Sequence, residues 1–316
     1  MNPVLSSLLP VMLLIAIGFI AGKLRWIRPE ATKDLSNLVF FVLTAALLFR
    51  TMSRVHIGQL DFKPVAVYFA VAGFLFFALL AVWGMNSRAA VLALASIFSN
   101  NVMIGIPLVA LAYGDQALVL LFTLISLHSL VLLTTVTVVL ELLQAHEMAL
   151  AGTAPQQHRL RMVWQAVKSA IIHPVPMPII AGLLFSLTGW SLPDVVDRPL
   201  LLLGNAFGPV ALLLVGITLA QVSIRGQIKG AVLVAGIKTL VHPLLMALAG
   251  LALGMHGQSL IVLVVAAALP VGANVFLFSQ RYEKAQELVT ASMAVSTLLA
   301  LLSVSLVMML APRFLS

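Results

Sequence analysis

Long apolar runs recur along the whole sequence, and they limit what it can fold into more than any other feature. Each run has roughly the 20-residue length of a membrane-spanning helix, and only 9% of the 316 residues are charged, against about 25% in an ordinary soluble domain. Backbone in a bilayer must pair its own polar groups, which leaves helices or closed barrels. Because the runs lack the alternation of barrel strands, the sequence predicts an all-α polytopic membrane protein.

Hydropathy and helix-breaking residues predict about ten spans, five in each half of the chain. The first five-helix repeat is expected at 1–143 and the second at 163–316, with a polar linker at 144–162. The expected spans are 4–22, 34–53, 64–84, 90–112, 117–140, 168–189, 199–221, 230–253, 258–279 and 287–311.

The distribution of basic residues predicts the orientation in the membrane. With the N-terminus outside, 12 Lys and Arg residues fall in inner loops and 5 on the outer side, and Lys238 is left within a span. Since inner loops carry the excess of basic residues, both termini are expected in the periplasm of a bacterial inner membrane and the linker in the cytoplasm. The net charge of +8 is scattered between apolar runs, so it indicates topology and not a nucleic-acid partner.

An odd number of spans per half predicts that the second half is inserted upside down relative to the first. Such inverted repeats are common in secondary transporters. A faint repeat supports this, because Pro10-Val11 and Gly18 in the first span recur as Pro174-Val175 and Gly182 in the sixth.

Two interruptions fall in corresponding places, the fourth span of each half. The segments are Ser99–Pro107, with Gly105 and Pro107, and Pro270–Asn274, with Gly272. Proline removes an amide and clashes with the preceding turn, and glycine permits unwound backbone. Broken helices in matching positions are the best sequence indication of a transporter's binding site. The alternative is a pair of simple proline kinks, which membrane helices tolerate.

The interruptions also predict the charge of the solute. A half-helix that begins inside the membrane directs the partial positive charge of its N-terminus into the cavity, which favours an anion. No carboxylate lies at the centre of a span, whereas a site for a cation would need one. We therefore expect a small organic anion, hydrogen-bonded by the amides of Asn100, Asn101 and Asn274.

Other polar residues within the spans have two interpretations each. His128, with Ser126 nearby, either completes the pocket or hydrogen-bonds a neighbouring helix. Lys238 and His242, four residues apart on one helical face, either serve a charge or proton role or, for Lys238, extend toward the inner surface. The chain has no cysteine and no recognised metal or catalytic constellation, so no metal, no cofactor and no enzymatic activity are expected. Coupling to a proton or to sodium stays open.

The interrupted segments resemble those of the auxin efflux carrier family, which includes bacterial malonate or carboxylate permeases and the plant PIN carriers. In the first half the likeness comprises Asn100, Gly105-Ile106-Pro107-Leu108 and Tyr113-Gly114-Asp115-Gln116-Ala117, and in the second Leu269-Pro270-Val271-Gly272-Ala273-Asn274. Val102 and Thr44 stand where the family usually has a glycine and a proline, so the first break is expected to be less unwound.

The resemblance implies a fold like that of the bile-acid sodium symporters, in which a panel domain faces a core with two broken helices that cross at its centre. It implies a secondary transporter that moves a small organic anion, such as malonate or an auxin-like acid, by alternating access. The core would rock against a scaffold of the first, second, sixth and seventh spans. The alternative is a solute channel or membrane sensor with the same pocket. The oligomeric state is open, a homodimer being one option.

Overall fold

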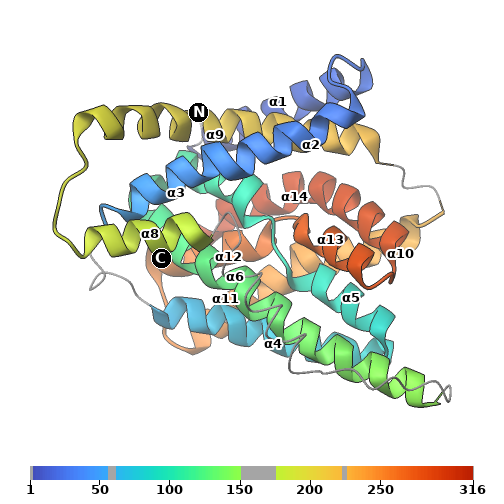
Figure 1. Cartoon of the computed structure of the whole chain (residues 1–316). Helices are drawn as coiled ribbons and strands as arrows, with labels where there is room; N and C mark the ends of the chain where they lie inside the picture. The colour runs from blue at the N-terminus through green and yellow to red at the C-terminus, as the bar shows by residue number, and fades with distance from the viewer. Residues whose placement is uncertain (1–2, 56–61, 151–175, 223–225, 316) are drawn as a thin grey trace.

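The computed structural model describes residues 3–55, 62–150, 176–222 and 226–315, and Figure 1 shows these ranges to be built from helices. No strand occurs within them; one isolated antiparallel bridge joins Ser99 to Val271. The predicted all-α class is confirmed. The elements are α1 (Pro3–Lys23), α2 (Pro29–Asn37), η1 (Leu38–Thr44), α3 (Ala45–Met52), α4 (Phe62–Trp83), α5 (Ser87–Ile97), η3 (Asn101–Gly105), α6 (Ile106–Leu150), α8 (Pro176–Ser186), α9 (Asp194–Gln221), α10 (Ile228–Gly236), η4 (Ile237–Val241), α11 (His242–Ala252), α12 (Gly257–Ala268), α13 (Asn274–Arg281) and α14 (Gln286–Phe314).

Six helical stretches of the described chain are long and apolar enough to cross a membrane. They are Pro29–Met52, Phe62–Trp83, Asn101–Gln144, Asp194–Gln221, Ile228–Ala252 and Gln286–Ala311. Shorter apolar helices lie at Leu8–Lys23, Ser87–Ile97, Met177–Ser186 and Gly257–Ala268. The protein is therefore a multi-pass membrane protein, and the count of ten spans stays a prediction.

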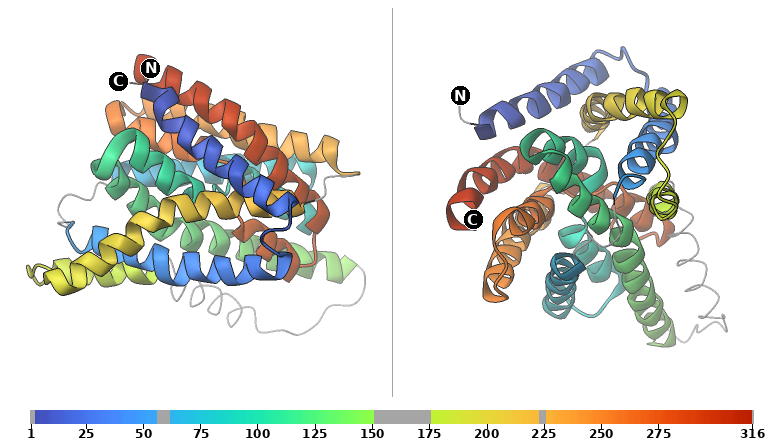
Figure 2. Two further views of the ribbon diagram at one scale, coloured as in Figure 1. Left: turned by 90° about the horizontal axis from the view of Figure 1, so that it is seen from above. Right: turned by 90° about the vertical axis from the view of Figure 1, so that its left-hand side faces the viewer.

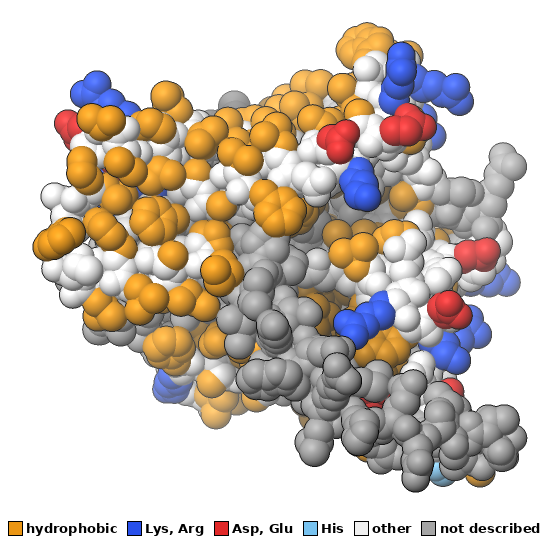
Figure 3. All heavy atoms as spheres, viewed as in Figure 1, with side chains coloured by type: hydrophobic (Ala, Val, Ile, Leu, Met, Phe, Trp, Pro, Cys, Tyr) orange, Lys and Arg blue, Asp and Glu red, His pale blue; other side chains and the backbone are white. Residues whose placement is uncertain are grey.

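The surface agrees with a lipid environment. On the face shown in Figure 3, hydrophobic side chains cover most of the left and upper surface, whereas most charged side chains lie toward the right-hand end, with a few at the left edge. Many large apolar side chains are exposed along the helices, for example Phe74 at 66% and Leu302 at 72%. In water such a surface would be unfavourable, but lipid tails solvate it.

Four elements form a layer along one side of the molecule, as the right-hand view of Figure 2 shows. In this layer α1 packs along α9, and α3 packs on both α8 and α9. Close approach of α1 and α9 depends on glycine, because a Cβ at Gly18 would lie 2.1 Å from the Leu213 carbonyl oxygen. At one end Asp197 of α9 accepts hydrogen bonds from Arg50 at 2.9 Å and Arg54 at 2.7 Å. These are the helices expected to form the scaffold.

The remaining helices pack on one another beside this layer. The pairs α10 with α14, α11 with α12, and α4 with both α5 and α11 make the main contacts. Helix α12 is buried from Leu260 to its end, and Leu263, Val265 and Ala268 have no exposed surface. The broken helices lie within this group.

Three described segments are π-helical, η1, η3 and η4, where the helix is wider by about one residue per turn. Thr44, at the position where the family usually has a proline, ends η1 and donates its hydroxyl to the Val39 carbonyl at 2.7 Å. Pro243 lies in the first turn of α11, just after η4. Because π-turns occur frequently at functional sites, Phe40 in η1 and Lys238 in η4 are candidates for a functional role.

The helix ends differ in places from the expected spans. The fourth and fifth expected spans are joined in α6, with a change of direction at Gly114, whose φ of 75° favours glycine. The same helix continues to Leu150, so the first residues of the expected 144–162 linker are helical. Residues 151–162 and the start of the expected sixth span, with Pro174 and Val175, lie outside the described residues.

Candidate functional site

The two interruptions cross and hydrogen-bond to each other. The Asn100 amide donates to the Pro270 carbonyl at 2.9 Å, and the Gly272 amide donates to the Phe98 carbonyl at 2.9 Å. The unwound segments thus form a short antiparallel pair between α5 and η3 on one side and α12 and α13 on the other. The Val271 amide donates to Ser296 Oγ at 3.0 Å. These bonds satisfy backbone groups that proline and the broken helices leave free, which burial requires.

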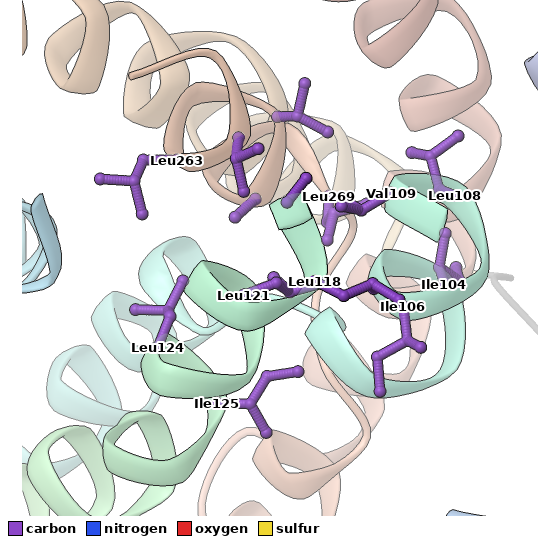
Figure 4. Packing of buried hydrophobic residues seen from close by; sticks show 14 of the residues in the cluster. Ile104, Ile106, Leu108, Val109, Leu118, Leu121, Leu124, Ile125, Leu263 and Leu269 are labelled. Atoms are coloured by element: carbon purple, nitrogen blue, oxygen red, sulfur yellow. The ribbon is translucent and has the colours of Figure 1, made fainter. Parts of the chain in front are cut away.

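Close packing at the crossing needs the two predicted glycines. A Cβ at Gly272 would lie 2.9 Å from Phe98 Cδ1, and one at Gly105 would lie 2.8 Å from Leu269 Cδ1. Figure 4 shows Leu269 among apolar side chains of η3 and α6, including Val109 and Leu118. Pro107, in the first turn of α6, is buried and faces Gly208 of α9. An apolar core therefore holds the crossing in place.

A small cavity of about 40 Å³ lies at the crossing. Its wall combines both breaks with α6 and with η1, which leads directly into α3 and packs on α9. We call α1, η1, α3, α8 and α9 the scaffold layer. The lining residues are Phe40, Phe98, Ser99, Asn100, Asn101, Val102, Met103, Ile125, His128, Ser129, Gly272, Ala273 and Asn274. None of them carries a carboxylate, a guanidinium or an ammonium group.

The three predicted asparagines line this cavity. Asn100 caps η3, its side-chain oxygen accepting from the Met103 amide at 3.3 Å. Asn101 is 2% exposed; its side-chain amide lies near the Tyr68 hydroxyl but makes no hydrogen bond of normal geometry in the described part of the chain. Asn274 begins α13 and donates to Ser129 Oγ at 3.4 Å. Helices η3 and α13 both begin here, so their first amides contribute partial positive charge.

Of the two site residues predicted on α6, one lines the cavity and the other does not. His128 lines the cavity and is 3% exposed, with its ring 4.4 Å from that of Phe98 between centroids. Ser126 is not among the lining residues; its hydroxyl donates to the Thr123 carbonyl at 2.7 Å. Ser129 takes the place in the wall that was expected for Ser126.

Lys238 does not extend toward the membrane surface, so that interpretation is wrong. The side chain is fully buried, and Nζ donates to the carbonyl of Ala267, in the last turn of α12. A donor in this position satisfies one of the carbonyls that a helix C-terminus leaves free. His242, also fully buried, follows in the next turn. Neither residue is part of the cavity wall.

Sequence reasoning missed three contributors to the site. Phe40 reaches the cavity from η1, and Ser99 from the first break. Tyr68 of α4 lies behind the wall, fully buried, with its hydroxyl 3.0 Å from Ser99 Oγ. Tyr68 is a lone hydroxyl in a strongly apolar helix, and that rarity is the signal that could have identified it.

Comparison with known proteins now gives the family. A family model described as membrane transport protein matches residues 3–308. The chain belongs to this family, that of the auxin efflux carriers. The resemblance found in the interrupted segments is confirmed, and the family and the relatives are transporters and not enzymes.

Three relatives illustrate the range of the family. A protein of Rhizobium meliloti (strain 1021) named "Putative malonate transporter" is 26% identical over 96% of this chain and 95% of its own length. An "Uncharacterized transporter" of Methanothermobacter thermautotrophicus is 24% identical over 95% of this chain and 96% of its own. "Auxin efflux carrier component 8" of Arabidopsis thaliana is 22% identical over 65% of this chain and 66% of its own.

Proposed function

We propose that this membrane transporter is a secondary carrier that moves a small organic anion by alternating access, and that the solute binds in the cavity at the crossing. The observation that carries the proposal is the cavity wall, where two helix N-termini and three asparagine amides meet without any carboxylate. Donors of this kind bind a carboxylate and need no fixed cation. The amide of Asn101 makes no hydrogen bond of normal geometry within the described residues, so it is available to bind the solute.

The size of the cavity favours a compact acid. About 40 Å³ holds little more than a few water molecules, since one water needs roughly 10–15 Å³ by this measure. Malonate, the solute in the name of one relative, therefore fits better than an indole acid such as auxin, which would require the wall to open.

Alternating access needs two groups of helices that can move past each other, and the cavity lies where they meet. Phe40 belongs to the scaffold layer, whereas the other lining residues belong to the breaks and α6. A second cavity, of about 650 Å³, is lined by Phe276 and Gln280 of α13 and by Thr218 of α9. Helix α13 thus connects the binding residue Asn274 with a wider opening between the scaffold layer and the core.

The remaining topology belongs to the same proposal. The halves 1–143 and 163–316 would be inverted repeats joined by a cytoplasmic 144–162 linker, in a bacterial inner membrane with both termini periplasmic. The distribution of 12 basic residues on one side and 5 on the other supports this orientation. If two copies of the chain form a homodimer, each subunit contains its own complete crossing, because all lining residues of the cavity come from one chain.

The function is tested by uptake of radiolabelled malonate into proteoliposomes that contain the purified protein. A carrier shows saturable uptake that is accelerated by malonate inside the vesicle, and malonamide, which is uncharged, should compete poorly. Flux that does not saturate would indicate the alternative, a channel; binding without flux would indicate a sensor.

The site is tested in the same vesicles with Asn274→Ala. We expect uptake to be abolished although the protein still folds, because a lost hydrogen bond at a buried site costs about 1–3 kcal/mol. Asn205→Ala, which removes an exposed asparagine of α9, is the matched control and should transport normally. Unchanged uptake by Asn274→Ala would place the solute elsewhere.

A further inference from the structure

A buried group of titratable side chains extends from the cavity into the core. The rings of His128 of α6 and His242 of α11 both lie close to Tyr68 of α4, with centroids 5.9 and 5.4 Å from that of the tyrosine. Lys238 of η4 lies one helical turn before His242. None of the four side chains is more than 3% exposed. Of the four, only His128 belongs to the cavity wall.

Unpaired nitrogen atoms distinguish the two histidines from ordinary packing residues. Nε2 of His128 and both ring nitrogens of His242 are buried, and none of them has a hydrogen-bond partner within the described ranges. A neutral imidazole has one N–H donor and one acceptor, and a protonated imidazole has two donors. Because native proteins rarely leave such buried groups unpaired, a ligand or proton that completes them is expected. At His128 the cavity leaves room for one.

The charges around His128 define what that ligand can be. The titratable groups that face it are Tyr68 from α4, Lys238 from η4 and His242 from α11. No Asp or Glu lines the cavity; Glu141, which has one buried carboxylate oxygen, lies 13 residues further along α6, about 20 Å away at 1.5 Å per residue. Lys238 is directed to the Ala267 carbonyl. Among the described residues, therefore, none beside His128 carries a negative charge that could stabilise the protonated imidazole, and a bound anion would supply that charge.

We propose that His128 takes up one proton from water when the anion binds, so that the carrier moves the anion and the proton together. The proton forms a bond with a ring nitrogen of His128 as the solute enters, and the same bond breaks when the solute leaves. This inference rests on the function proposed above.

The physical reason is charge compensation in a medium of low dielectric constant. A lone anion at mid-membrane depth is costly to move, and so is a lone imidazolium. Side by side they attract each other strongly, and the loaded site carries one unit of negative charge less. After the anion departs, the buried imidazolium has no partner and releases its proton, which returns the empty carrier with a neutral histidine.

The experiment measures protons directly. Purified protein in detergent, in weakly buffered solution at pH 7.5 with an indicator dye, is mixed with malonate adjusted to the same pH. We expect the native protein to take up about one proton per bound malonate, and the malonate affinity to fall about tenfold for each unit rise in pH, as linkage requires. No proton uptake on malonate binding by the native protein would overturn the proposal without any variant.

Variants assign the proton to His128. In His128→Gln, proton uptake should disappear and the pH dependence of binding should flatten. His146→Gln, which changes an exposed histidine of the same helix, should behave like the native protein. Proton uptake that persists in His128→Gln would mean that malonate or another residue carries the proton, and would refute this assignment.

The outcomes separate this inference from the function on which it rests. If malonate is bound and transported without proton uptake, the proposed carrier function stands and the proposed proton coupling is wrong. Absence of any binding or uptake of malonate or related carboxylates would overturn both.

Discussion

Replacing Gly272 by alanine tests the crossing of the two breaks most directly. The added Cβ would lie 2.9 Å from Phe98 Cδ1 and 3.0 Å from the Ser99 carbonyl oxygen, closer than carbon atoms normally approach. The phenylalanine ring can turn, but the carbonyl belongs to the backbone of the opposite break. The two segments must therefore separate, and the hydrogen bond from the Gly272 amide to the Phe98 carbonyl must lengthen.

The expected cost follows from this geometry. Inserting a methyl group into a well-packed site typically destabilises by about 1–3 kcal/mol. The φ of Gly272 is not positive, so alanine adds no backbone strain there, and the whole effect should come from packing. Because the crossing also shapes the cavity, we expect Gly272→Ala to lose most of its malonate uptake even at temperatures where the variant is still folded.

The assay is thermal unfolding of the purified protein in detergent, followed by tryptophan fluorescence, together with uptake in vesicles. Gly73→Ala is the control, because a Cβ there would meet no atom within 4 Å, and helix propensity favours alanine. Its melting temperature should equal or exceed that of the native protein, whereas that of Gly272→Ala should be lower.

A double variant examines the cause. Phe98→Leu combined with Gly272→Ala should recover part of the lost stability, since the aromatic contact is removed but the contact with the Ser99 carbonyl stays. If Gly272→Ala were as stable and as active as the native protein, the breaks would not pack as the structure describes, and the reasoning would be refuted.

Two further predictions concern charge. Lys238→Gln should lower the melting temperature by removing the hydrogen bond from Nζ to the Ala267 carbonyl at the end of α12, but should keep the preference for malonate over malonamide. Lys229→Gln, on the exposed surface of α10, is the control. Loss of the preference in Lys238→Gln would mean that the lysine, and not the helix N-termini, selects the anion. An impermeant thiol reagent applied to intact cells should label a cysteine introduced at Ser316 and not one at Gln156, and the reverse result would invert the topology predicted from the basic residues.

Several features of the site followed from the sequence because they depend on local chemistry. Proline and glycine interrupt a helix wherever it packs, so the breaks at Pro270 and Gly272 could be located without a structure. Asparagine side chains next to a break can hydrogen-bond a solute for the same local reason, so Asn100 and Asn274 could be predicted as residues of the site. The family resemblance rested on the same segments.

The orientation of individual side chains did not follow in the same way. Ser126 and Ser129 lie three residues apart on one face of α6, and packing against α13 decides that Ser129 contacts Asn274. Lys238 sits in a π-helical turn; one extra residue in a turn rotates the following face by about 100°, so simple helical periodicity predicts its direction poorly.

What the sequence alone determined is the solvent and the class of fold: apolar runs of spanning length need a bilayer, and backbone in a bilayer needs helices. What only the tertiary structure decided is which distant residues meet. The pairing of Asn100 with Pro270, and the positions of Tyr68 and Phe40 near or in the cavity, depend on contacts between helices far apart in the chain. Apolar helices resemble one another in composition, so the sequence says little about which helices pack together. Close contacts at glycines and buried hydrogen bonds between helices decide which ones do.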